Sequence, residues 1–152
     1  MRTIGVAMLT CLIGAGPVLA DGQPPPAVRA AWAIGLPNGY AILEHQERNV
    51  EVSPADVARG MVEVRAGSRL AIVTQAPGGY AVDFHLRGGW PLAVRILGLA
   101  SPLVLLGHGG TAEQRATVPG RQVVTLDYQF QLAPEMAPGT YAWPLQMTVR
   151  KP

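Results

Sequence analysis

The stretch Val124-Thr125-Leu126-Asp127-Tyr128-Gln129-Phe130-Gln131-Leu132 contains the clearest structural signal in the chain. Apolar and polar residues alternate along it without a break. Successive side chains of a β-strand point to opposite faces, so this alternation is typical of a strand with one buried and one solvated face. The stretch therefore predicts a strand whose Tyr128 and Phe130 lie in a core.

The same period recurs in three other segments. Apolar residues take every second position in the sets Tyr80, Val82, Phe84 and Leu86; Trp90, Leu92, Val94 and Ile96; and Tyr141, Trp143, Leu145, Met147 and Val149. Each segment predicts one strand with one buried face. Pro91 and Pro144 have no backbone N–H, so we expect them at strand edges or bulges.

Shorter apolar segments predict weaker strands at 28–34, 40–44, 60–65, 70–74 and 103–106. Residues 103–106 are apolar throughout, which favours a strand buried on both faces. If the region 97–106 were exposed instead, it would form an apolar patch that marks a partner site. Gly, Pro, Asn and Ser predict reversals at 37–39, 66–68, 77–79, 88–89, 107–110, 119–120 and 138–139.

The pattern predicts a single short helix, from Ser53 to Arg59. Ser53 is a suitable N-cap, Pro54 suits the first helical position, and Asp56 completes an approximate capping box. About eight or nine strands at roughly ten-residue spacing, with no long helical period, predict an all-β protein. We expect an antiparallel, immunoglobulin-like β-sandwich formed by residues 28–152.

The N-terminal residues predict export. Arg2 precedes an uncharged apolar run from Ile4 to Leu19, and Val18-Leu19-Ala20 fits a cleavage site, so we expect a signal peptide at 1–20. Residues 21–27 are rich in proline and predict an extended tether. The expected location is the periplasm or the extracellular space.

Composition narrows the function classes. Cys11 is the single cysteine and lies inside the predicted signal, so the mature chain would form no disulfide. A lipid anchor on Cys11 would require a small residue before it, where this chain has Thr10. Charged residues make up 14% of the chain and form no basic run, which argues against nucleic acid. No further segment after the signal is long and apolar enough to predict a transmembrane span.

Residues that could carry chemistry are scattered. They are Ser53, Ser68 and Ser101, the histidines His45, His85 and His108, and Glu44, Glu47 and Glu51. No serine lies in a Gly-x-Ser-x-Gly turn, and no two histidines have a spacing that brings them together locally. The glutamates near His45 could support acid–base chemistry, and a charged loop explains them equally well. We predict no catalytic residue, no metal site, no cofactor and no enzymatic activity.

The segment Pro138-Gly139-Thr140-Tyr141-Ala142-Trp143 is the most specific local signal. In immunoglobulin-like sandwiches a tyrosine after a turn bonds back to the turn backbone through its hydroxyl. We expect Tyr141 to do so and Trp143 to lie in the core. The predicted structural residues are therefore Gly139, Tyr141 and Trp143, together with Tyr128 and Phe130.

These motifs carry a resemblance. The stretch from Tyr128 to Leu132, the segment Ala137–Tyr141 and the alternating final strand resemble the C-terminal half of bacterial exported β-sandwich proteins, such as fimbrial subunits and the spore coat protein U family. Val73-Thr74-Gln75 and Gly79-Tyr80-Ala81-Val82 are similar to a strand pair of exported surface domains. Subunits of these families usually carry a cysteine pair, which the predicted mature chain lacks.

The resemblance implies a structural or protein-interaction module of a periplasm or cell surface, such as an accessory component of a pilus-like assembly. One predicted contact is the strand that carries Val28, Ala30, Trp32 and Ile34. This strand could insert into a neighbouring subunit, or it could form the first strand of its own sheet. The competing hypothesis is a monomeric binding module for a small molecule or metal ion, with His45 and His108 meeting between loops.

Overall fold

The alternating stretch forms most of strand β9 (Gly120–Gln131) in the computed structural model, which describes residues 33–36, 39–74, 78–115 and 120–152. Its residues Leu126, Tyr128 and Phe130 are buried, while Asp127 and Gln129 lie on the opposite face. The period-two alternation therefore predicted both the strand and its buried face correctly.

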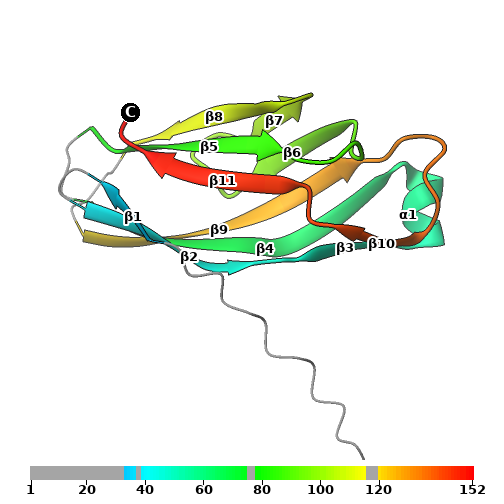
Figure 1. The fold of residues 1–152 in the computed structure, drawn as a ribbon, viewed down its shortest axis with the longest axis horizontal. Coiled ribbons are helices and arrows are strands. Elements are labelled where there is room, and N and C mark those ends of the chain that lie inside the picture. The colour runs from blue at the N-terminus through cyan, green and yellow to red at the C-terminus, as the bar shows by residue number, and fades with distance from the viewer. Residues whose placement is uncertain (1–32, 37–38, 75–77, 116–119) are drawn as a thin grey trace, which may run out of the picture.

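Eleven strands are described, all paired antiparallel (Figure 1). A six-stranded sheet has the order β1-β2-β4-β9-β6-β7. Besides β9 it contains β1 (Ala33–Leu36), β2 (Gly39–Gln46), β4 (Met61–Thr74), β6 (Ala93–Leu97) and β7 (Leu103–Leu106). A three-stranded sheet contains β11 (Leu145–Arg150), β5 (Tyr80–Leu86) and β8 (Gly109–Gln114), and a two-stranded sheet pairs β10 (Gly139–Ala142) with β3 (Asn49–Val52).

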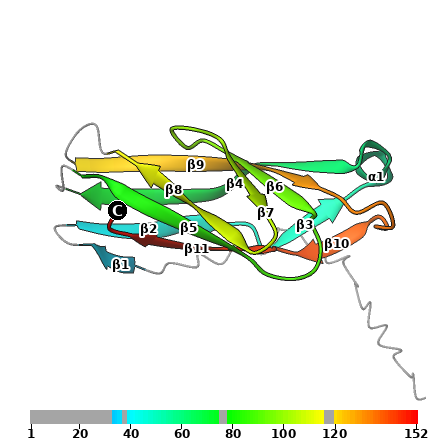
Figure 2. The same ribbon diagram turned by 90° about the horizontal axis from the view of Figure 1, so that it is seen from above.

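The six-stranded and three-stranded sheets form the two layers of a β-sandwich (Figures 1 and 2). Their facing side chains form one apolar core, with Leu70, Ile72 and Ile96 from the larger sheet and Phe84 and Met147 from the smaller one. Burying each large apolar side chain stabilises the fold by about 1.5–3 kcal/mol. The predicted all-β sandwich is confirmed, with more strands than the eight or nine expected.

The predicted reversal at 66–68 is wrong, because β4 continues through it as a bulge. Val64 pairs with Tyr128 and Ser68 with Leu126, so β4 carries extra residues between them. Ala66 has a φ of 50°, and its N–H donates to Oδ1 of Asp127 at 2.6 Å. The turn-like Ala-Gly-Ser sequence thus marks a strand irregularity, where a residue must leave the extended conformation.

The C-terminal segment forms two strands in place of the single strand predicted. β10 pairs with β3, whereas β11 pairs with β5 in a different sheet. Trp143 and Pro144 separate them, with Trp143 N–H donating to Arg48 C=O at 2.7 Å and Pro144 C=O accepting from Arg87 N–H at 2.6 Å. The proline marks the point at which the chain changes sheet.

Sequence reasoning missed two short strands. β3 has only two inward apolar residues, Val50 and Val52, so its alternation is too short to predict a strand. β8 contains two glycines and one inward apolar residue, Ala112, so its alternation is too weak to recognise.

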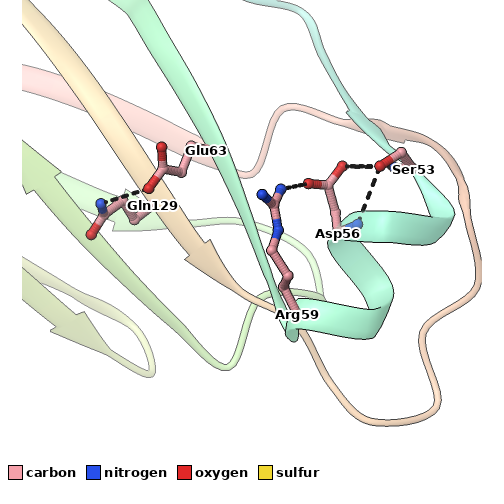
Figure 3. Close-up of polar contacts among 5 residues, drawn as sticks. All are labelled: Ser53, Asp56, Arg59, Glu63 and Gln129. Atoms are coloured by element: carbon pink, nitrogen blue, oxygen red, sulfur yellow. Dashed lines mark hydrogen bonds and ion pairs between the residues drawn. The ribbon is translucent and has the colours of Figure 1, made fainter.

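The predicted helix is confirmed as α1 (Pro54–Arg59). Figure 3 shows one half of its capping box, in which Asp56 N–H donates to Ser53 Oγ at 3.2 Å. In the other half, Ser53 N–H donates to Asp56 Oδ2 at 2.9 Å. Arg59 pairs with the same carboxylate, and Gly60 ends the helix with a φ of 68°. Over the described residues, no helix has the length and apolar character needed to cross a membrane.

The predicted signal at 1–20, the tether at 21–27, and Val28, Ala30 and Trp32 of the predicted contact strand lie outside the described residues. Ile34 lies in β1 and pairs with Ala41 of β2. Residues 33–36 therefore belong to a strand of their own chain's sheet, at its edge.

Candidate functional site

The predicted aromatic residues converge in one cluster. The ring centroids of Trp143 lie 4.9 Å from those of Tyr128 and 5.5 Å from those of Phe130, both edge to face. Tyr141 joins through Trp90, which lies 5.4 Å from both Tyr141 and Phe130. The Tyr141 hydroxyl donates to Ala137 C=O at 2.7 Å, which is the bond to the turn that the sequence predicted. Trp90 was expected only as a core residue of its strand.

The polar groups of this aromatic cluster serve the structure of the core. The buried Tyr128 hydroxyl donates to Ser68 Oγ at 2.8 Å and lies 3.6 Å from Met147 Sδ. Burial raises the pKa of Tyr128 far above its ordinary value, so the phenol stays protonated. Trp143 Nε1 is buried without a hydrogen-bond partner among the described residues. The aromatic rings join β9 to β10. Gly139 is the first residue of β10 and pairs with Val52 of β3.

The histidines do not assemble the metal site of the competing hypothesis. His108 lies with His85 in a shallow depression on the outside of β5 and β8, together with Asp83 and Thr111. His45 lies on β2 instead, 3.4 Å from the Glu47 carboxylate. Within the described ranges, no group of three or more histidine, cysteine or acidic side chains could hold a metal ion.

The glutamates near His45 are also separated. Glu44 forms ion pairs with Arg69 at 3.1 Å and Arg121 at 2.5 Å. Glu51 lies on β3, and its side chain is exposed. Two ion pairs therefore engage the Glu44 carboxylate, and neither Glu47 nor Glu51 takes part in them. The arrangement therefore does not resemble a pair of catalytic carboxylates.

Strand β7 differs from the sequence-based expectation. Leu105 is buried, but Val104 is 55% exposed and Leu106 is 74% exposed. The prediction that residues 103–106 are buried on both faces is therefore wrong. β7 is the last strand at one end of the six-stranded sheet, and among the described residues no further strand pairs with its outer side.

The register places the exposed residues of β7 beside those of β6. Val104 pairs with Arg95 and Leu106 with Ala93, and these two β6 residues pair with Gln129 and Gln131 of β9. All of these side chains face away from the core. Leu92, which precedes β6, is 54% exposed. We call Ala93, Arg95, Val104 and Leu106 the β7 patch.

A shallow groove adjoins the β7 patch. Its volume is about 370 Å³, and it is lined by Gly60, Met61, Ala93, Arg95, Val104, Gln129 and Gln131. One lining residue, Gln129, donates through Nε2 to Glu63 at 3.0 Å, as Figure 3 shows. Glu63 is therefore engaged by Gln129. The groove itself combines an apolar edge, formed by Ala93 and Val104, with the exposed guanidinium group of Arg95.

The outer face of the other sheet is polar and internally bonded. Asp83 on β5 accepts from Thr111 Oγ1 of β8 and from Arg150 Nε of β11, each at 2.6 Å. Burial disfavours the charged form of Asp83, but these hydrogen bonds and the Arg150 charge outweigh it and lower the pKa of Asp83. The exposed aliphatic side chains of β7 thus have no counterpart there.

Comparisons with protein-family models, with curated proteins and with solved structures found no match to this chain. The resemblance to fimbrial subunits and to the spore coat protein U family therefore stays a prediction from sequence. The candidate site rests on the geometry of the β7 patch alone.

Proposed function

We propose that this protein is an exported, non-enzymatic interaction module that binds another protein through the β7 patch. The observation that carries the proposal is the exposure of Val104 and Leu106 on the terminal strand of a sheet. Exposed aliphatic side chains grouped at the open edge of a sheet are costly in water and are a common feature of protein–protein contacts.

The sequence of β7 supports the same proposal. Proteins protect free strand edges with charged residues, prolines or bulges, since an open edge invites pairing with another chain. The four residues of β7 are Leu, Val, Leu and Leu, so the edge is short but carries neither a charge nor a proline. An apolar edge of this kind is consistent with a strand that has a partner in the cell.

Site-specific photo-crosslinking in the native host tests the proposal. We expect a photoreactive phenylalanine at Leu106 to give a discrete adduct with another protein, and the same residue at Thr111 to give none. Thr111 is the matched control because it is exposed on the outer face of the opposite layer. Equal adducts from both positions, or none from Leu106, would contradict the proposal.

Export is tested separately. We propose cleavage after Ala20, based on the n-region, apolar run and small-residue pattern. Intact mass spectrometry of the exported fraction should give a chain that begins at Asp21. A chain that keeps Met1 in the cytoplasmic fraction would contradict export without affecting the β7 contact.

A further inference from the structure

We propose that the occupant of the β7 edge is an extended segment of another protein, with alternating apolar residues and a carboxylate that meets Arg95. The segment would add to the six-stranded sheet as a seventh strand beside β7. This inference rests on the proposed function and specifies the chemistry of the partner.

The backbone supports strand addition as the mode of binding. In an antiparallel sheet, alternate residues of an edge strand direct their N–H and C=O groups away from the neighbouring strand. Within the described part of the chain, strand β7 pairs with β6 on one side only, which leaves such groups available on the other side. Main-chain hydrogen bonds then supply affinity, and side chains at alternate positions supply specificity.

The side chains define what the added strand carries. On the inner face, Leu105 and the half-buried Leu103 end the core, so apolar residues of a partner would extend it. On the outer face, the strand would run past Val104 and Leu106. A residue level with Val104 lies two strand spacings from Arg95, about 10 Å between backbones. Two long side chains can meet over that distance above the smaller valine.

The charge of Arg95 favours an acidic residue at that level. Arg95 is exposed, and it forms no ion pair or hydrogen bond with any residue in the described part of the chain. The nearest carboxylate in its row of the sheet is Glu63, which lies two strands away and accepts from Gln129. A cation beside an apolar edge selects a partner with the complementary charge.

A second copy of this chain fits the edge less well. Antiparallel pairing of two β7 strands with their outer faces aligned can place Val104 opposite Val104 or opposite Leu106. The first register puts two Arg95 side chains in one row, and the second places Arg95 level with Ala93 of the other copy. Neither register supplies a carboxylate. A stable dimer also buries at least about 1,200 Å², which is large for a four-residue edge.

The test is a titration of the nitrogen-15-labelled full chain with two capped peptides, followed by amide chemical shifts. The peptides are Thr-Val-Glu-Val-Leu-Val-Thr and the same sequence with Lys in place of Glu. We expect shifts confined to β6 and β7, and binding of the Glu peptide about threefold to tenfold tighter than the Lys peptide. A Glu peptide with an N-methylated central valine should bind far more weakly, since it loses a ladder hydrogen bond.

Variants of the protein provide the controls. Arg95→Glu should reverse the preference between the two peptides, and Arg95→Lys should keep it. Arg87→Glu changes the net charge equally at an exposed arginine outside the β7 patch, and it should leave the preference unchanged. Equal affinity of the two peptides, with shifts still at β7, would overturn the acidic preference and leave strand addition standing.

Two further outcomes separate this inference from the proposed function. Absence of shifts at millimolar peptide, with the Leu106 crosslink retained, would overturn strand addition but not the interaction module. A concentration-dependent dimer that protects the β7 amides without peptide would identify a second copy as the occupant and would also overturn the inference.

Discussion

At the scale of single residues, the buried bond between Tyr128 and Ser68 is the most sensitive polar contact of the core. Tyr128→Phe removes the donor and leaves the Ser68 hydroxyl buried without it. We expect a loss of about 1–3 kcal/mol in the free energy of unfolding, measured by urea denaturation.

Two further variants make this prediction specific. Tyr141→Phe removes a hydroxyl that bonds to Ala137 near the surface, and should cost less, about 1 kcal/mol. Adding Ser68→Ala to Tyr128→Phe should recover part of the loss, because no polar group is then left unpaired. A double variant less stable than the sum of both single variants would contradict the assignment.

The Asp83 carboxylate links β5 to both of its neighbouring strands, β8 and β11. We expect Asp83→Asn to lower the free energy of unfolding by about 1 kcal/mol at neutral pH. Because the folded pKa of Asp83 is lowered, its contribution is present above the unfolded pKa near 3.9 and is lost as the pH falls below it. Urea midpoints measured from neutral pH to about pH 2 should therefore fall less steeply in Asp83→Asn than in the native protein. If the urea midpoints of the two proteins fall equally steeply below neutral pH, this role of Asp83 is contradicted.

At the scale of elements, the bulge of β4 depends on Gly67. A Cβ at this position would lie 2.8 Å from Trp143 Cη2 and 2.9 Å from Tyr128 Cδ2. We expect Gly67→Ala to destabilise the fold by about 1–3 kcal/mol, since the aromatic rings must move to admit the methyl group. Gly89→Ala is the matched control, because a Cβ there meets no atom within 4 Å. Equal denaturation midpoints for the two variants would contradict the prediction, because they would mean that the aromatic rings move aside without a loss of stability.

The same elements show what the sequence could predict. Alternation located β5, β9 and the inward faces of β10 and β11, because long strands with one buried face leave a clear period. It failed at the β4 bulge, where the residues of a turn and of a strand irregularity are the same. It also failed at β7, because an apolar run reads alike whether a strand is covered on both sides or lies at an open edge. Exposure of the region 97–106 is the alternative that the sequence left open, and the position of β7 at the end of the sheet accounts for the exposure of Val104 and Leu106.

At the scale of the whole molecule, contacts between distant segments hold the sandwich together. Gln46 Nε2 donates to Leu145 C=O across 99 positions and joins the two layers, and Ser68 meets Tyr128 across 60 positions within the larger sheet. The consecutive strands β2 and β3 also belong to different sheets, because β2 pairs with β4 whereas β3 pairs with β10. The two layers are therefore joined by contacts between residues far apart in sequence.

We therefore expect the sandwich to unfold in one cooperative transition and to refold in milliseconds to seconds, as all-β proteins with distant pairings do. In a Trp32→Phe background, fluorescence reports Trp90 and Trp143 of the aromatic cluster, whereas far-ultraviolet circular dichroism reports all strands. Urea midpoints from the two methods should coincide. A fluorescence change that precedes the loss of strand signal would mean that β3 and β10 open separately from the two layers, and the aromatic cluster would then be a local clasp and not part of a common core.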